Sequence, residues 1–300
     1  MKPMSHPGFA RLMPLVLILS SVSWGWLEPV PVWEVNSMVH ENTPCLSYDG
    51  LSLYFTRGGT PDFYYYRLYK ASRSEPTGHF TIVEELASPF HSYVHVNGPW
   101  VSPDNLRMYY YTAGYGSMKM SQRMSVDAPW PQGQDVSELN ALGDIRGMSL
   151  TADELNIFFR AKILGGEGGY DVWTATRSDK DYPFIGVTNL PEINTLFNEH
   201  DPSISADGLT LYFSSDRNGS VKLFEAKRSS LNEPFGAPQQ LHFFDSPGVE
   251  LGAPFLSPDG TALYFTKRAD SEQLDIYVSY IPEPATLVLL GLGSLALRRR

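Results

Sequence analysis

The chain has 300 residues, of which 42% are hydrophobic, 13% aromatic and 19% charged, and its formal net charge is −10. This apolar fraction excludes a disordered chain, and the acidic balance argues against a nucleic-acid ligand, which requires a basic face. The single cysteine, Cys45, excludes an intrachain disulfide framework and a multi-cysteine metal cluster. A low charged fraction with many aromatic residues favours β structure.

Residues 1–25 have the pattern of a secretory signal peptide. Lys2 and Arg11 form a basic region, an apolar run of about ten residues follows from Met13, and the small residues Ser23 and Gly25 come next. We therefore expect an N-terminal signal helix that directs export and is cleaved off. An uncleaved anchor helix is the alternative, although the run is short for a membrane span.

Five copies of one segment occupy the middle of the chain, at intervals of 55, 49, 54 and 52 residues. They read SYDGLSLYF from Ser47, SPDNLRMYY from Ser102, TADELNIFF from Thr151, SADGLTLYF from Ser205 and SPDGTALYF from Ser257. A strand that ends at Ser or Thr, a tight turn with Asp and Gly, and a strand that opens with Leu-Tyr-Phe predict a β-hairpin. Glu154 stands where this turn favours Gly, so we predict a strained or differently built turn there.

Two further strands complete each copy. In four copies the third strand ends on an arginine, and a fourth stretch then begins near an aromatic residue and ends on leucine. The arginines are Arg73, Arg123, Arg177 and Arg228. Four strands in about 52 residues are the size of one propeller blade.

The order of these strands predicts a closed ring. The fifth copy stops at Tyr280 without a fourth strand, and Val30–Val35, before the first copy, offers the missing one. Closure would leave no unpaired sheet edge at the seam. We therefore predict an all-β fold over residues 26–281: a single β-propeller of five four-stranded blades closed by an N-terminal strand, with six blades as the alternative.

The copies resemble WD40-like propeller repeats of the TolB type. The resemblance rests on the Ser-x-Asp-Gly-x-x-Leu-Tyr-Phe core, on the SSDRNG run from Ser214 and on the Asp-aromatic strands at Asp171 and Asp275, and it covers roughly residues 37–281. It implies the fold and leaves the activity open, because such repeats serve both as binding modules and as companions of catalytic domains. TolB-like proteins usually have an extra N-terminal domain and six blades, so a role in envelope transport does not follow.

Residues 282–300 closely resemble a PEP-CTERM sorting signal. Its parts occur in order: Pro282, Glu283 and Pro284, then thirteen uncharged residues, then Arg298, Arg299 and Arg300. The resemblance implies an exosortase-type membrane protease as the partner, removal of the tail, and delivery from an inner-membrane intermediate to the envelope or extracellular matrix of a Gram-negative-type bacterium. A helix of thirteen residues reaches about 20 Å, against about 30 Å of hydrocarbon, so we expect this hydrophobic helix to contact the membrane transiently. An ordinary C-terminal anchor is the alternative.

Both end segments are basic, and without them the central 256 residues hold 18 basic and 32 acidic residues, a net charge of −14. This sharpens the argument against nucleic acid as a partner.

The candidate binding site is the mouth of the central channel, where loops of all blades converge. The loops before the innermost strands supply His40, Glu41, His95, Arg146, Glu199, His200 and Glu250. The loops after the Leu-Tyr-Phe strands supply Arg57, Arg160 and Arg217. The alternative is that these side chains cap strands or pair with one another at a wet surface.

No sequence motif of a catalytic site occurs: there is no Gly-x-Ser-x-Gly elbow, Walker loop or dinucleotide fingerprint. We interpret His91 with His95, the glycines of residues 165–169, and Cys45 as structural, and we expect no catalytic residue, metal or cofactor. The sequence favours a non-catalytic binding or scaffold module for polysaccharide or a surface protein. The alternatives are a purely structural surface protein and a propeller glycoside hydrolase that uses inner-rim carboxylates about 5–9.5 Å apart, such as Glu41, Glu199 and Glu250.

Overall fold

The computed structural model describes residues 26–60, 63–86, 89–90, 95–112, 117–246, 248–268 and 273–281. Residues Trp26–Ile281 form one compact unit. The expected signal helix, the expected C-terminal hydrophobic helix and the motif residues from Pro282 to Arg300 lie outside the described residues.

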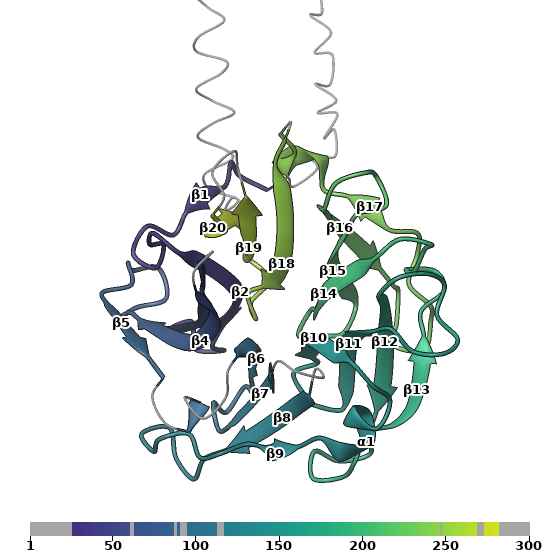
Figure 1. Ribbon diagram of the computed structural model, residues 1–300, viewed down its shortest axis with the longest axis horizontal. Helices are drawn as coiled ribbons and strands as arrows, with labels where there is room; N and C mark the ends of the chain where they lie inside the picture. The colour runs from purple at the N-terminus through teal and green to yellow at the C-terminus, as the bar shows by residue number, and fades with distance from the viewer. Residues whose placement is uncertain are drawn as a thin grey trace, which may run out of the picture. The chain divides into compact units, whose positions relative to one another are not determined.

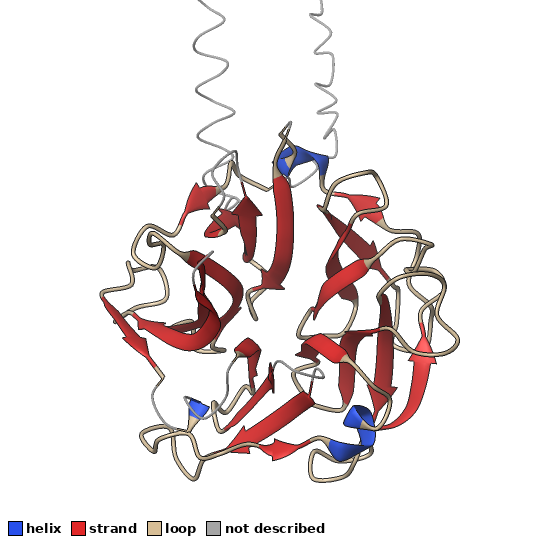
Figure 2. Ribbon diagram, in the orientation of Figure 1, coloured by secondary structure: helices blue, strands red, loops and turns tan. Residues whose placement is uncertain are grey.

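Five four-stranded antiparallel sheets surround a central axis and form the blades of a propeller (Figures 1 and 2). Blade 1 contains β2 (His40–Leu46), β3 (Ser52–Thr60), β4 (Phe63–Ser72) and β5 (Ile82–Glu85). Blade 2 contains β6 (Val96–Val101), β7 (Arg107–Thr112), β8 (Ser117–Gln122) and β9 (Gln134–Asp135). Blade 3 contains β10 (Ile145–Leu150), β11 (Asn156–Ala161), β12 (Asp171–Thr176) and β13 (Ile185–Asn189). Blade 4 contains β14 (Glu199–Ile204), β15 (Thr210–Ser215), β16 (Lys222–Lys227) and β17 (Gln239–Gln240).

Blade 5 contains strands from both ends of the unit, and it closes the ring. It consists of β18 (Glu250–Leu256), β19 (Ala262–Arg268), β20 (Asp275–Tyr280) and β1 (Val30–Pro31). Two short helices, α1 (Ser137–Asn140) and η2 (His242–Phe244), connect blades. The predicted five-bladed all-β propeller with a closing N-terminal strand is confirmed.

The closing strand is shorter than the predicted Val30–Val35. Val30 pairs with Val278, and the backbone N–H of Val32 still donates to the carbonyl of Ile276 at 2.9 Å. The chain then turns inward, so that Val35 is fully buried. The apolar pattern of this segment therefore reflects packing between blades 5 and 1, and only its first part is strand.

The hairpin turn of each blade is held by its own side chains. At Ser47, the hydroxyl donates to Asp49 Oδ1 and accepts the N–H of Ser52, and Asp49 also accepts the N–H of Leu51. The same bonds recur in the other four blades. The recurrent Asp residues are thus turn formers, as the sequence indicated.

Glu154 confirms the prediction of a strained turn, because its φ is +60°, where Gly208 and Gly260 have +74° and +73°. Its carboxylate is buried between two arginines, 3.3 Å from Arg107 and 3.5 Å from Arg177. Arg107 belongs to the preceding blade, at a position where the other blades have Ser, Asn, Thr or Ala. The exceptional Glu and the exceptional Arg therefore form one contact between blades 2 and 3.

Replacing Glu154 by glycine changes both the backbone strain of the turn and the ion pairs of the carboxylate. Glycine would relieve backbone strain of about 1 kcal/mol, but it removes the carboxylate that two buried arginines share, while Arg107 keeps its ion pair with Asp181. We expect a net loss of about 1–3 kcal/mol in the free energy of unfolding, measured by urea denaturation. Asn105→Gly, in the same turn of blade 2 with φ +57°, is the control without an ion pair; it loses only the neutral hydrogen bond from the Tyr54 hydroxyl and should stay within about 1 kcal/mol of the wild type. A Glu154→Gly variant as stable as the wild type or more so would show that the ion pairs contribute no more than the backbone strain costs.

The arginines that end the third strands are structural. Each donates through Nε to the carbonyl of the turn residue at 2.7–2.8 Å and lies 4.2–4.7 Å from the centroid of the aromatic ring that opens the fourth stretch. The pairs are Arg73 with Phe80, Arg123 with Trp130, Arg177 with Phe184, and Arg228 with Phe235. This repeated contact fastens the outer strand to the hairpin turn.

Candidate functional site: the channel mouth

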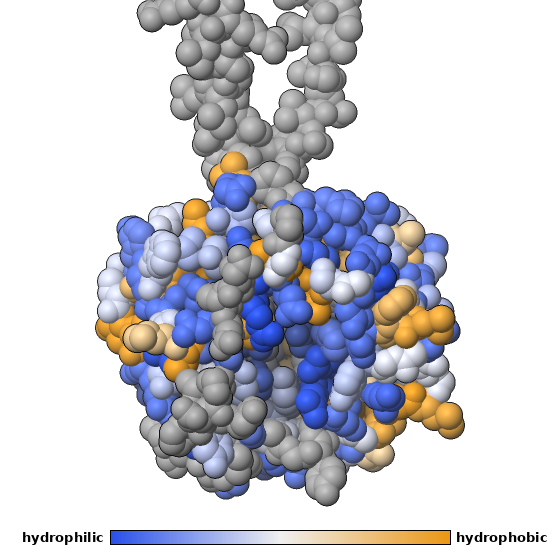
Figure 3. Space-filling model, turned by 45° about the horizontal axis from the view of Figure 1, so that its top comes forward, coloured by the Kyte–Doolittle hydropathy of each residue, from blue (hydrophilic) through white to orange (hydrophobic). Residues whose placement is uncertain are grey.

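All ten predicted binding residues lie at one end of the blades. Six stand at the start of innermost strands or directly before one, and pairing places the end of the second strand beside them, as in Glu41 with Arg57, Arg146 with Arg160, and Glu250 with Arg268. His200 follows Glu199 in β14, and Arg217 lies two residues after β15. Figure 3 shows hydrophilic residues bordering a central hollow on one face, with hydrophobic residues farther out.

Glu41 and Glu199 are internal clamps of the fold. Both side chains are fully buried. Glu199 accepts hydrogen bonds from the backbone N–H and the hydroxyl of Thr195, and Arg217 Nη2 lies 3.0 Å from its Oε1. Glu41 has the same partners in Ser37 and Arg57, with Arg57 Nε at 2.8 Å. Burial raises the pKa of Glu41, and the bonds from Ser37 and the charge of Arg57 oppose this shift.

The two clamps extend to the segments that lead into blades 1 and 4. Arg57 Nη2 donates to the carbonyl of Val35, and Arg217 Nη2 donates to that of Ile193. Each guanidinium also stacks on the third strand, 4.6 Å from the Tyr69 ring and 4.7 Å from the Phe224 ring. Four of the ten predicted residues thus serve the packing of the mouth. This matches the pairing alternative for these four.

Three asparagines that the sequence analysis did not single out join consecutive blades. Each donates from Nδ2 to a carbonyl of the preceding blade's third strand and accepts the N–H of the same residue at Oδ1: Asn36 with Ile276, Asn140 with Met118, and Asn194 with Val172. A signal for them exists in the sequence as Glu-aliphatic-Asn at residues 34–36, 138–140 and 192–194.

Three further predicted residues, Glu250, His40 and His95, belong to blades 5, 1 and 2. Glu250 pairs with Arg268 at 3.3 Å, and both side chains are exposed. The N–H of Leu274 donates to His40 Nδ1, and burial and then the charge of Arg268 lower the pKa of His40. His95 lies between the rings of Tyr65 and Tyr66, 5.9 and 6.1 Å from their centroids.

Blade 3 brings two arginines together at the mouth. Arg146 in β10 and Arg160 in β11 are direct cross-strand partners, a position in which like charges repel. Arg146 Nε donates to Asp144 Oδ1 at 2.8 Å, whereas the ion pair of Arg160 with Asp201 is longer, at 3.9 Å. The Nε of Arg160 is buried and has no hydrogen-bond partner among the described residues.

His200 and Tyr170 position Arg160. Arg160 Nη1 donates to His200 Nδ1 at 2.6 Å, which requires the neutral imidazole with its proton on Nε2. The guanidinium carbon of Arg160 lies 5.2 Å from the Tyr170 ring centroid, and the Tyr170 hydroxyl donates to Asp144 at 2.9 Å. Burial, and next the charge of Arg160, lowers the pKa of His200.

This shift predicts a loss of stability in mild acid. The charged and titratable groups around His200 are Arg160, Asp201, Asp216, Glu199 and Tyr170. A histidine with a lowered pKa in the folded state refuses the proton that the unfolded chain accepts below its ordinary value of 6.5, so the free energy of unfolding decreases as the pH falls through that value. The raised pKa of Glu41 acts in the opposite direction.

We expect His200→Gln to reduce the slope of the free energy of unfolding against pH between pH 7 and 5 by up to about 1.4 kcal/mol per pH unit, the limit for one proton. Urea denaturation at several pH values measures this slope. His242→Gln, at an exposed histidine of blade 4, should leave the slope unchanged. An unchanged slope in His200→Gln would contradict the assignment.

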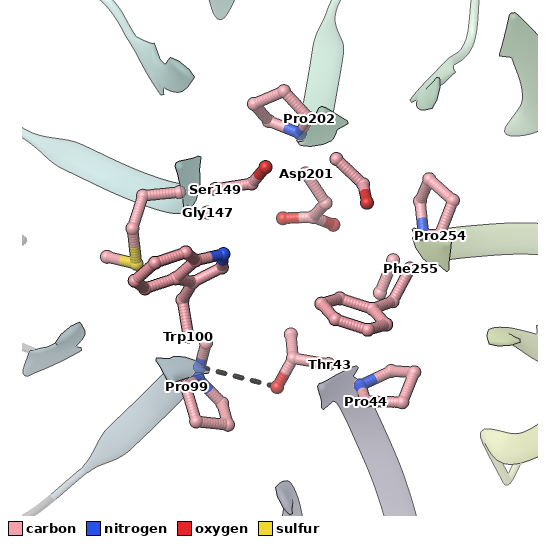
Figure 4. Close-up of a pocket in the computed structure, with 14 residues that line it drawn as sticks. Thr43, Pro44, Pro99, Trp100, Gly147, Ser149, Asp201, Pro202, Pro254 and Phe255 are labelled. Atoms are coloured by element: carbon pink, nitrogen blue, oxygen red, sulfur yellow. Dashed lines mark hydrogen bonds between the residues drawn. The ribbon is translucent and has the colours of Figure 1, made fainter. Parts of the chain in front are cut away.

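A ring of five β-bulges narrows the channel below the mouth. One residue in each innermost strand has a positive φ between +44° and +60°: Thr43, Gly98, Gly147, Asp201 and Ala253. Four of them precede proline, at Pro44, Pro99, Pro202 and Pro254. The space between them is about 30 Å³, room for one or two water molecules. Figure 4 shows Trp100, Asp201 and Phe255 pointing into it, so a ligand that enters from the mouth stops here.

The glycine-rich residues 165–169 pack against the loop that precedes β14. A side chain at Gly168 would meet the backbone of Leu196, and the N–H of Gly169 donates to the carbonyl of Phe197. The glycines therefore allow close packing of two loops, in agreement with the structural interpretation. Cys45 is buried, which raises the pKa of its thiol to about 12.

Two further observations concern membrane-spanning helices and metal sites. Within the described residues, no helix is long and apolar enough to cross a membrane. In the same part of the chain, no three His, Cys, Asp or Glu side chains gather as a metal site would require.

Comparisons with known proteins identify the C-terminal motif and the fold. Residues 281–300 match the family model described as the PEP-CTERM protein-sorting motif. No curated protein sequence matches the chain. The motif marks an exported protein that is sorted by exosortase in Gram-negative-type bacteria.

Several solved structures share the propeller fold at low identity. A putative TolB from Agrobacterium tumefaciens is 14% identical, with a TM-score of 0.50 over 82% of this chain and 78% of that one. An endo-arabinase from Bacteroides thetaiotaomicron is 15% identical, with a TM-score of 0.55 over 85% of this chain and 96% of that one. A glycosyl hydrolase from Bacteroides ovatus is 12% identical, with a TM-score of 0.50 over 80% and 84%. These likenesses show the fold and, since they include hydrolases, leave the choice between binding and catalysis open. The chain is thus a five-bladed β-propeller with TolB-type structural neighbours, and it carries a PEP-CTERM sorting motif at its C-terminal end.

Proposed function

We propose that the propeller is a non-catalytic binding or scaffold module, displayed at the envelope or in the extracellular matrix, with its ligand site at the channel mouth. We further propose residues 1–25 as the cleaved signal peptide, residues 26–281 as the propeller and residues 282–300 as the tail that an exosortase removes. The ligand is a polysaccharide or another surface protein.

One observation carries the choice of binding over catalysis. The two inner-rim carboxylates that a hydrolase would need, Glu41 and Glu199, are fully buried and engaged by Arg57 and Arg217. A general acid or nucleophile must contact the glycosidic bond of the substrate. Neither glutamate side chain is accessible to a substrate, because both are fully buried. Glu250 is exposed, but it stands alone with Arg268.

A glycan array together with a reducing-sugar assay on the purified protein tests the proposal. We expect binding without release of reducing ends. Turnover that is lost in a folded Glu199→Gln variant would establish the hydrolase instead. The absence of binding to glycans and to envelope proteins would favour the purely structural alternative.

A further inference from the structure

The mouth is chemically uneven, and blade 3 is its cationic part. In blades 1 and 4 an arginine at or just after the second strand neutralises a buried glutamate, whereas blade 3 has Ile145 at the position of that glutamate and pairs the next residue, Arg146, with Arg160. Arg146 has about a third of its side chain exposed, and Nε is the atom that Asp144 accepts from. Two guanidinium groups on one face of the sheet therefore retain donor capacity toward the mouth.

Acceptors for hydroxyl groups flank these donors. Asp144 and Asp201 are partly exposed, with 30% and 22% of their side chains accessible. Asp201 has a φ of +46° as part of the bulge that recurs in all five blades, and its carboxylate lies 3.9 Å from the guanidinium of Arg160. A ligand that offers a carboxylate to the arginines and hydroxyl donors to the aspartates matches this arrangement.

An apolar rim lies next to the same cluster. Leu164 is fully exposed, Leu196 is 79% exposed and Phe197 is 49% exposed. The N–H of Gly169 donates to the carbonyl of Phe197, and the N–H of Tyr170 donates to Asn198 Oδ1, which places Phe197 beside Tyr170 and His200. Phe197 can stack on the C–H face of a pyranose ring, as aromatic side chains do in sugar sites.

We infer that this part of the mouth, formed by Arg146, Arg160, Asp144, Asp201 and Phe197, binds a sugar acid: one uronic-acid residue of a polysaccharide. The inference rests on the proposed binding function and names its ligand class. Arg146 and Arg160 hold the carboxylate, Asp144 and Asp201 accept from ring hydroxyls, and Phe197 contacts the ring. An acidic peptide would present carboxylates to Asp144 and Asp201 without hydroxyl donors, which disfavours it. The net charge of −14 in the central residues favours a single acidic sugar or a sparsely charged chain over a dense polyanion.

Titration calorimetry with trigalacturonate and with its methyl ester tests the inference, because the ester keeps the sugar rings and hydroxyls but replaces each carboxylate charge by a neutral methyl ester group. We expect the acid form to bind at least tenfold more tightly than the ester at low salt. Arg146→Gln and Arg160→Gln should each lower the affinity for the acid at least tenfold and abolish the preference over the ester. Arg268→Gln, in a different cross-strand pair at the mouth in blade 5, is the control and should bind as the wild type does.

The outcomes separate the inference from the function on which it rests. Equal binding of acid and ester, or binding of the ester alone, overturns the sugar-acid site and leaves a glycan-binding module. Binding of triglutamate as tight as that of trigalacturonate replaces the sugar by an acidic peptide. No binding of trigalacturonate overturns the inference, while the glycan array still decides the function. If Arg160→Gln fails to fold, Arg146→Gln and Phe197→Ala, both at partly exposed positions, keep the test decisive.

Discussion

Replacing Glu199 by alanine is expected to lower the free energy of unfolding by about 3–5 kcal/mol, the effect of removing one partner from a buried ion pair. Arg217 would then be left largely buried beside the emptied site, and the N–H and hydroxyl of Thr195 and the hydroxyl of Ser215 would lose their common acceptor. Since single domains are stable by about 5–15 kcal/mol, this loss brings the propeller close to unfolding at room temperature.

Glutamates of blades 1 and 5 serve as controls for the Glu199 variant. Glu41 is the same clamp in blade 1, so Glu41→Ala should be about as damaging. Glu250 begins the innermost strand of blade 5, one position before the equivalent of Glu199, with 46% of its side chain exposed, and Glu250→Ala should change the free energy of unfolding by less than about 1 kcal/mol. Urea denaturation followed by tryptophan fluorescence measures all three.

This prediction also discriminates between functions. Replacing a carboxylate that stabilises the fold lowers the free energy of unfolding. Replacing a catalytic carboxylate can leave the fold intact while the activity is lost. If Glu199→Ala were as stable as Glu250→Ala, the clamp would be wrong, and the carboxylate would again be a candidate for chemistry.

The blades could be predicted from the sequence because their strongest signal is local. In each turn, Ser or Thr, Asp and a residue tolerant of positive φ bond to one another within six residues, so the pattern survives five times in the chain. Even the exception at Glu154 followed from this chemistry. Its reason, the charge of Arg107 in the preceding blade, depends on contact between blades and could not be read from the turn.

The sequence predicted which residues lie at the channel mouth, but it did not predict what each of their side chains does there. Glu41 and Glu199 stand at equivalent positions and each faces inward to an arginine, whereas Arg146 lies one position later in its blade and stands beside another arginine. Which of these occurs depends on register, because a shift of one residue along a strand turns a side chain to the other face of the sheet. The bulge ring was hidden for a similar reason: a residue before proline is usually extended, whereas Thr43 and Asp201 have positive φ there.

Closure of the ring predicts the second large effect, at Val32. This residue is 6% exposed and lies in a core with Leu46, Phe55, Tyr264 and Ile276, which belong to blades 1 and 5. Val32→Asp removes about 1.5–3 kcal/mol of apolar burial and places an unpaired carboxylate in that core, so we expect a loss of at least about 4 kcal/mol. The neighbouring Trp33 is 77% exposed, and Trp33→Asp adds the same charge one residue later with an expected change below about 0.5 kcal/mol.

The way in which Val32→Asp unfolds is as informative as the size of its effect. The seam joins residues about 250 positions apart, for example through the N–H of Leu27 and the carbonyl of Tyr280, so it forms only when nearly the whole chain is in place. In a closed ring, damage at the seam lowers the stability of all five blades together, and amide hydrogen exchange should accelerate in blade 3 as well as in β20. Faster exchange confined to blades 5 and 1 would instead indicate an open array whose ends meet without stabilising the centre.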